Sequence, residues 1–193
     1  MRKKLIAAAL VGSAVAVAVS VFAGTAGAAP TSPPAGRLAL LAQPERAQDA
    51  LPDFVPAAQL ADDGLVINST RLLGQAKGAR HWAARDTAGN VCLVTTLGST
   101  PAEQVTGMTC ASPKDFDAKG LTLQVARLTD ATEAHLLPDG YTAAAQASPQ
   151  LTVISPNLAI SDATDGSTAP IPLAPGNGAT SELKIPNLSA AGS

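Results

Sequence analysis

The chain has 193 residues, of which 15% are charged and 3% are aromatic, and its formal net charge is −2 at pH 7. No basic cluster follows the first four residues, which disfavours binding to nucleic acid or to an acidic surface by charge alone. Because aromatic residues are scarce, a core must be built mainly from Leu, Val, Ile and Ala, and a covalent cross-link would help to stabilise it.

The first 28 residues have the pattern of a Sec-type signal peptide. The basic start "MRKK" is followed by an uncharged apolar run from Leu5 to Phe22, and then by small residues at Ala26 and Ala28. This pattern predicts cleavage after Ala28, so that the exported chain begins at Ala29. Loss of the three basic side chains would change the net charge from −2 to −5. The alternative is an uncleaved membrane anchor, because the apolar run is close to the length that spans a bilayer.

The rest of the chain divides by composition into three parts. Residues 29–37 are expected to be a spacer, residues 38–160 a single disulfide-stapled domain, and residues 161–193 a loose tail rich in Pro, Ser, Ala and Gly. The predicted fold class of the domain is α+β: a small antiparallel β-meander with one or two short flanking helices and one disulfide.

Two short helices are predicted before the meander. Pro44 can occupy the first turn of one helix, and Pro52 ends it. Pro56 starts the second helix, which presents Leu60 to the core and stops at Gly64.

Three strands are predicted across residues 69–97. Lys77-Gly78 and Gly89-Asn90 are suited to the two turns between them. The third strand, "VCLVTTL", is apolar on both faces, as expected of a central strand. A short strand, "VTGMTC", is predicted after the polar loop that follows.

The next helix has clear ends in the sequence. Ser112 is expected to cap residues 113–119, and Gly120 to end them. Alternation over residues 121–128 predicts a strand, and residues 133–144 are interpreted as two strands joined at the turn "PDG". In the tail, "QLTVIS", "LAIS" and "ELKIP" are each expected at most as a short edge strand, with the prolines preventing a continuous sheet.

The two cysteines, Cys92 and Cys110, are predicted to form a structural disulfide. An even and solitary pair in an exported chain favours this assignment. The separation of 18 residues does not fit a C-x-x-C redox motif. Free thiols or a disulfide to a partner protein are the alternatives.

In the order of these features the chain resembles a set of small, uncharacterised exported proteins from actinobacteria, the high-GC Gram-positive bacteria. The pieces that carry the resemblance are "LALLAQPERAQDALP", "RLLGQAKGARHWAARDTAGNVCLV", "TCASPKDFDAKGLTL" and "EAHLLPDGYTA". Together they cover about residues 38–145. The resemblance implies export, and it brings no assigned activity and no catalytic residues.

No pattern typical of a catalytic or metal site occurs. The two histidines, His81 and His135, lie in predicted strands, without a G-x-S-x-G or H-E-x-x-H motif, and are expected to be packed or surface imidazoles. "DATDG" at residues 162–166 lacks the glutamate of a calcium loop. We therefore predict no catalytic residue, no metal ligand and no cofactor.

Trp82 is the one large side chain that the sequence offers as a contact for a ligand or partner. Strand alternation places it on the same face as Arg80. The other interpretation is that Trp82 is buried over the helix at residues 113–119, near Phe116.

The leading functional hypothesis is a non-enzymatic binding or cell-envelope module that is secreted or associated with the cell wall. Its expected partner is a protein or cell-wall ligand, with no nucleic acid and, after cleavage of the signal peptide, no membrane. The alternative is a secreted hydrolase or hydrolase-inhibitor domain that uses the polar loop at residues 98–104.

Overall fold

The computed structural model describes residues 38–128, 130–162, 169–176 and 181–188. The signal peptide and spacer predicted for residues 1–37 lie outside this part of the chain, as does most of the "DATDG" segment. Within it, no helix is both long enough and apolar enough to cross a membrane.

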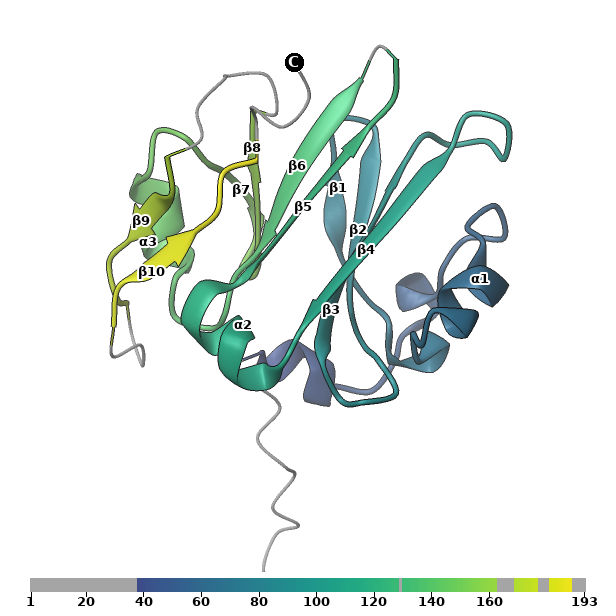
Figure 1. Cartoon of the computed structure of the whole chain (residues 1–193), viewed down its shortest axis with the longest axis horizontal. Coiled ribbons are helices and arrows are strands. Elements are labelled where there is room, and N and C mark those ends of the chain that lie inside the picture. The colour runs from purple at the N-terminus through teal and green to yellow at the C-terminus, as the bar shows by residue number, and fades with distance from the viewer. Residues whose placement is uncertain (1–37, 129, 163–168, 177–180, 189–193) are drawn as a thin grey trace, which may run out of the picture. The chain divides into compact units, whose positions relative to one another are not determined.

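The first four strands form an antiparallel sheet in chain order (Figure 1). They are β1 (Arg71–Ala76), β2 (Ala79–Arg85), β3 (Val91–Leu97) and β4 (Val105–Ala111). This confirms the predicted meander. Every residue of β3 is buried, because the strand is central in the sheet and both of its faces are covered, which explains why its sequence is apolar on both sides.

A second antiparallel sheet has the strand order β5-β6-β8-β7. Its strands are β5 (Leu121–Ala126), β6 (Ala131–Leu136), β7 (Thr152–Ser155) and β8 (Leu158–Ser161). The expectation that "LAIS" is an edge strand is wrong, since β8 pairs with β6 on one side and with β7 on the other. The four residues of β8 contain no proline and are all buried, so nothing prevents a position inside the sheet.

The two sheets pack face to face over the main hydrophobic core. This core consists of Leu38, Leu73, Ala83, Val91, Leu93, Phe116, Leu121, Ala134, Leu136, Leu158 and Ile160. The sheets also approach each other at an edge, where a Cβ atom placed on Gly74 of β1 would lie 2.8 Å from Ile154 Cγ2 of β7. Glycine at position 74 therefore permits the contact between β1 and β7.

Two of the helices predicted from the sequence are present in the structure. Helix α1 (Ala57–Asp62) buries Leu60, and helix α2 (Pro113–Lys119) is capped by the Ser112 hydroxyl, which accepts a hydrogen bond from the Asp115 backbone N–H. Both helices were predicted.

The predicted helix after Pro44 is not formed. Two short 3-10 helices, Ala39–Ala42 and Ala47–Asp49, lie on either side of an extended segment, and a third, Ile67–Ser69, precedes β1. The buried Asp49 carboxylate accepts hydrogen bonds from the backbone N–H groups of Arg46 and Leu72. This tie to β1 favours a tight local turn over a continuing helix.

The strand expected after "PDG" is instead helix α3 (Thr142–Ala147). Its sequence, "TAAAQA", contains four alanines, and alanine has the highest helix propensity of the residues. The apolar alternation that suggested a strand ends with β6.

The C-terminal part of the chain is packed where the structure describes it, whereas a loose tail was expected after residue 160. Strands β9 (Ile171–Leu173) and β10 (Leu183–Ile185) pair as an antiparallel hairpin. With α3 they cover the side of the second sheet that faces away from the first sheet (Figure 1). The residues of this second core are Leu137, Tyr141, Ala145, Leu151, Ala159, Ile171, Leu173, Leu183 and Ile185.

Candidate functional site

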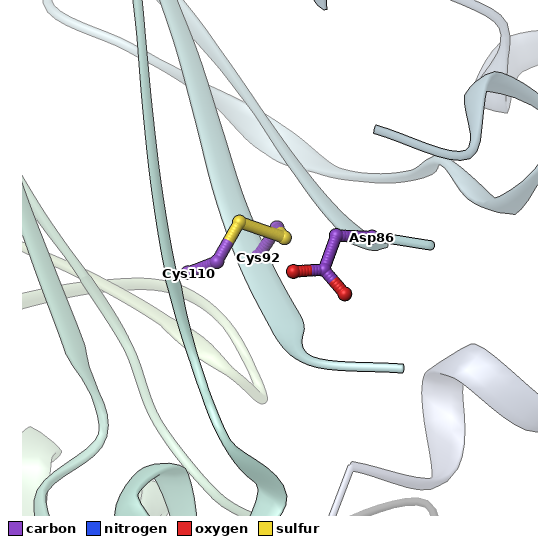
Figure 2. A group of neighbouring side chains, drawn as sticks. All are labelled: Asp86, Cys92 and Cys110. Atoms are coloured by element: carbon purple, nitrogen blue, oxygen red, sulfur yellow. A yellow bond between two sulfur atoms is a disulfide. The ribbon is translucent and has the colours of Figure 1, made fainter. Parts of the chain in front are cut away.

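The predicted disulfide between Cys92 and Cys110 is confirmed. The two cysteines are directly opposite each other on β3 and β4, and the Asp86 carboxylate points toward their sulfur atoms (Figure 2). Asp86 also accepts hydrogen bonds from the backbone N–H groups of Ala88 and Asn90, at 2.9 and 2.8 Å, and so builds the turn between β2 and β3. Because both sulfur atoms are oxidised, this group offers no thiolate to a metal ion.

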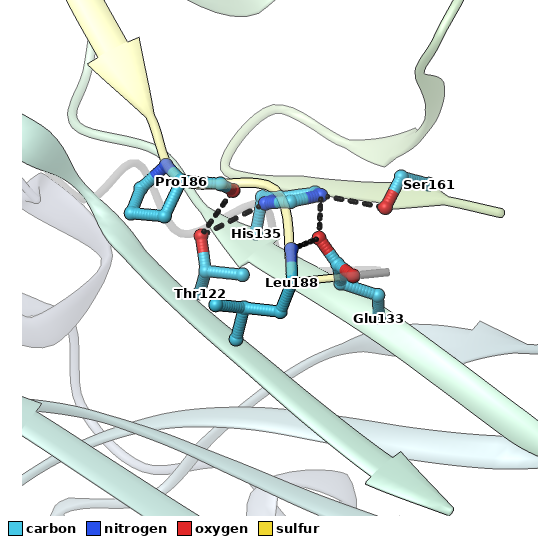
Figure 3. Close-up of polar contacts among 6 residues, drawn as sticks. All are labelled: Thr122, Glu133, His135, Ser161, Pro186 and Leu188. Carbon is cyan, nitrogen blue, oxygen red and sulfur yellow. Dashed lines mark hydrogen bonds and ion pairs between the residues drawn. The ribbon is translucent and has the colours of Figure 1, made fainter. Parts of the chain in front are cut away.

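His135 is at the centre of a buried polar network on the outer face of the second sheet (Figure 3). Its Nδ1 atom lies 3.0 Å from Thr122 Oγ1, and its Nε2 atom lies 2.9 Å from Ser161 Oγ and 3.5 Å from Glu133 Oε1. Glu133, His135 and Ser161 each have at most 2% of their surface exposed.

The network itself indicates the tautomer of His135. The Thr122 hydroxyl donates to the carbonyl oxygen of Pro186, which can only accept, so Thr122 accepts the proton of His135 Nδ1. The Ser161 hydroxyl can then donate to the lone pair of Nε2. Burial lowers the pKa of His135 from 6.5 to about 4. We therefore assign a neutral imidazole.

The same network holds the C-terminal segment against the sheet. The Leu188 backbone N–H donates to Glu133 Oε1 at 3.0 Å, and the Pro186 carbonyl accepts from Thr122 at 3.2 Å. Hydroxyl, imidazole and carboxylate groups occur together here, as they do in hydrolases, but the imidazole has no exposed surface. The arrangement as it stands is suited to anchoring the segment.

His81 is also buried, and it lies in a different part of the molecule. Its Nδ1 atom is 3.0 Å from Thr95 Oγ1 on the neighbouring strand, and burial lowers its pKa from 6.5 to about 4. Alternation along β2 places His81 on the same face as Ala79 and Ala83, toward the second sheet. His135 lies on the far side of that second sheet, so the structure does not bring the two imidazoles together.

Trp82 is buried, with 1% of its surface exposed, so it does not offer an exposed contact to a ligand or partner. Its neighbours in the core include Val55, Leu60 and Leu65, which come from α1 and the segments on either side of it. Phe116 of α2 belongs to the core between the two sheets, so the expected packing of Trp82 over α2 is wrong.

One hollow in the described part of the chain has a strongly charged lining, and it lies where the β1–β2 turn, the β3–β4 loop and the end of β5 meet. It has a volume of about 490 Å³. It is lined by Gln75, Ala76, Lys77, Gly78, Ala79, Arg80, Gly98, Ser99, Glu103 and Arg127. We call it the basic hollow, because three of these side chains are cationic and one is anionic. Three other hollows in the described part of the chain have at most one charged side chain each, and no histidine lines any of the four.

The cationic groups of the basic hollow are held by contacts within the protein. Arg127 donates through Nη1 to the carbonyl oxygen of Glu103 at 3.0 Å and forms an ion pair with Asp130. The Arg80 guanidinium lies over the Phe54 ring, 5.8 Å from its centroid. These contacts limit the freedom of both guanidinium groups.

The β3–β4 loop forms one rim of the basic hollow. Gly98 has a φ of 100°, and a Cβ atom at this position would lie 2.8 Å from the carbonyl oxygen of Glu103. The Thr100 hydroxyl donates to Glu103 Oε2 at 3.2 Å, and the Glu103 backbone N–H donates to the Thr100 carbonyl. The loop is thus an exposed turn with its own hydrogen bonds, inside the ring that the disulfide closes.

The basic hollow was not predicted from the sequence. Lys77 and Arg80 were recognised only as turn and strand residues, and Arg127 is 47 positions or more beyond them. The three residues meet because the β5–β6 hairpin ends beside the β1–β2 turn, which is a relationship between two sheets.

Comparisons of the chain with protein-family models, with curated proteins and with solved structures found no match.

Proposed function

We propose that this protein is an exported, non-enzymatic binding module of the bacterial cell envelope, and that the basic hollow is its binding site. The observation that carries the proposal is the separation between the imidazoles and the open surface. Both histidines are fully buried, whereas the basic hollow is open and is lined by cationic and hydroxyl-bearing residues. Such a surface can bind a ligand, and it offers no imidazole for general acid–base chemistry.

The compartment is part of the proposal. We infer that residues 1–28 are a signal peptide of an actinobacterial protein and that the exported chain is secreted or associated with the cell wall. The disulfide is compatible with an extracellular protein, because such bonds persist in oxidising environments. Mass spectrometry of the protein from culture medium should give a chain that begins at Ala29. A full-length chain in the membrane fraction would show an anchor instead.

Co-sedimentation tests the binding function. The protein purified from culture medium is mixed with isolated cell-wall material, and the bound fraction is measured over a range of protein concentrations. We expect saturable binding. Binding that never saturates, or that is equal for an unrelated acidic protein, would contradict the proposal.

A hydrolase inhibitor is the second candidate, and the β3–β4 loop favours it. This loop is exposed and lies inside the disulfide ring. Its turn is stabilised by the hydrogen bonds between Thr100 and Glu103. A restrained loop of this kind would enter a protease active site with little loss of conformational entropy. Inhibition assays against a panel of serine and cysteine proteases distinguish the two functions. Inhibition that Thr100→Ala abolishes would favour the inhibitor.

A further inference from the structure

We infer that the basic hollow recognises an oxyanion, the phosphate or carboxylate group of an envelope polymer. The inference rests on the proposed binding function and names the chemical class of its ligand. Its volume of about 490 Å³ lies within the roughly 300–1,000 Å³ that is usual for small-molecule sites. A single phosphodiester or uronic acid unit of a longer chain fits a hollow of this size.

The charge of the residues that line the hollow is the first argument for an oxyanion ligand. Among the lining residues Lys77, Arg80 and Arg127 are cationic and Glu103 is anionic, an excess of two positive charges that Asp130, the ion-pair partner of Arg127, reduces to one. The chain as a whole is acidic, with a net charge of −2. This excess at one site, against the charge of the whole chain, favours a ligand of negative charge over a neutral sugar.

The orientation of the arginine side chains is the second argument for an oxyanion ligand. Arg127 is oriented by the Glu103 carbonyl and by Asp130, whereas the Arg80 guanidinium lies over the Phe54 ring, which belongs to the Trp82 side of the first sheet. A guanidinium that is already oriented loses less side-chain entropy when it binds, and its planar fork matches the two oxygens of a carboxylate or phosphate. Asp130 neutralises part of the charge of Arg127, which leaves Arg80 and Lys77 as the main electrostatic contributors.

The Glu103 carboxylate weakens the affinity of the basic hollow for an anion. Its carboxylate lines the same hollow and repels an anion, while its backbone carbonyl positions Arg127. Replacing the carboxylate by an amide removes the repulsion, and the backbone contact does not depend on the side chain. The Glu103→Gln variant should therefore bind oxyanions more tightly, a result that partial unfolding could not produce.

The experiment uses backbone-amide NMR shifts of the protein purified from culture medium. The probes are inorganic phosphate, poly(glycerol phosphate) and polygalacturonate, with neutral polygalactose as the uncharged control. We expect saturable shifts at Gly78, Gly98 and Ser99 with the anionic probes only, and weaker binding as salt is raised. Tighter binding of one polymer than of inorganic phosphate identifies that polymer as the source of the oxyanion.

The variants separate this site from general charge effects. Lys77→Asn removes the ammonium and keeps a residue that tolerates the positive φ of 48° at this turn. We expect Lys77→Asn and Arg80→Gln each to weaken binding by about threefold and Glu103→Gln to strengthen it by about twofold, the range for single exposed charges. The matched control is Lys114→Gln on α2, an exposed lysine outside the hollow, which should leave the affinity unchanged.

The outcomes distinguish the two proposals. Equal effects of Lys114→Gln and Lys77→Asn, or equal shifts with polygalactose, would overturn the oxyanion assignment. Cell-wall binding that survives Lys77→Asn and Arg80→Gln would leave the binding function in place and remove this ligand class. Oxyanion binding without any binding to cell-wall material would instead remove the envelope function.

Discussion

Cys92 on β3 and Cys110 on β4 are register partners whose Cα atoms are 4.1 Å apart and whose sulfur atoms are bonded. The disulfide therefore joins two strands that already pair, and it closes the ring that contains the β3–β4 loop. Cys92 and Cys110 themselves pack in one core with Trp82 and Leu60.

Removal of this disulfide should lower the free energy of unfolding by about 2–5 kcal/mol, because the unfolded chain loses a constraint. The double variant Cys92→Ala/Cys110→Ala is compared with the parent by urea denaturation monitored by circular dichroism. Thiol labelling of the denatured, unreduced parent is the control and should find no free thiol. A double variant as stable as the parent would contradict a stabilising role.

Stability should fall on acidification between about pH 6.5 and pH 4. Burial lowers the pKa values of His81 and His135 from 6.5 to about 4, so in this range the unfolded chain binds protons that the folded chain does not. At about pH 4, each histidine should lower the free energy of unfolding by up to about 3 kcal/mol, because a pKa difference of one unit corresponds to about 1.36 kcal/mol. Urea denaturation at pH 7 and pH 4.5 measures the effect.

NMR titration of the imidazole signals provides the direct check on that interpretation. Both rings should stay neutral in the folded protein at pH 5.5, and His135 should carry its proton on Nδ1, as the Thr122 and Pro186 contacts require. A His135 ring that is charged at pH 7 would show that Glu133 outweighs burial.

Truncating Leu183 should destabilise the protein strongly, because the β9–β10 hairpin is part of the second core. Leu183 has 0% of its surface exposed, whereas Leu128 is fully exposed. Leu183→Ala should cost about 2–5 kcal/mol, and the matched control Leu128→Ala should stay within about 0.5 kcal/mol of the parent. Equal effects of the two substitutions would mean that the hairpin is not packed in solution.

Gly98→Ala should disturb the β3–β4 loop, and Gly89→Ala is its matched control. Both glycines have positive φ values, 100° and 81°, but a Cβ atom at Gly89 meets nothing within 4 Å, whereas one at Gly98 would lie 2.8 Å from the Glu103 carbonyl. Thermal denaturation should show Gly98→Ala to be the less stable variant by about 1 kcal/mol or more. Amide shifts of Ser99 and Lys77 should change in that variant alone.

The elements that were predicted correctly depend on short-range signals. Ser112 and Gly120 mark the ends of α2, because capping is decided by residues within one turn of the helix. The run "VCLVTTL" indicated a central strand, because only a strand covered on both faces is apolar on both. The disulfide also followed, since Cys92 and Cys110 lie on strands that are consecutive in the chain.

What the sequence left open depends on contacts between distant segments. The sequence predicted at most a short edge strand at "ELKIP", and no local pattern indicated that the outer face of the second sheet would cover Leu183 and Ile185. The interior position of β8 depends in the same way on β6 and β7 together. An exposed apolar sheet face makes burial of such a hairpin favourable, and this overrides the effect of the prolines around it.

By itself, then, the sequence determined the order of the central strands, the capped helix and the disulfide, because neighbours in the chain settle each of them. Only the tertiary structure decided the candidate site. Lys77, Arg80 and Arg127 meet at the basic hollow, and His135 meets Ser161, because strands from different parts of the chain are placed side by side. Charge and hydrogen bonding act over a few ångströms in space, whatever the separation along the chain, so no local pattern encodes these groupings.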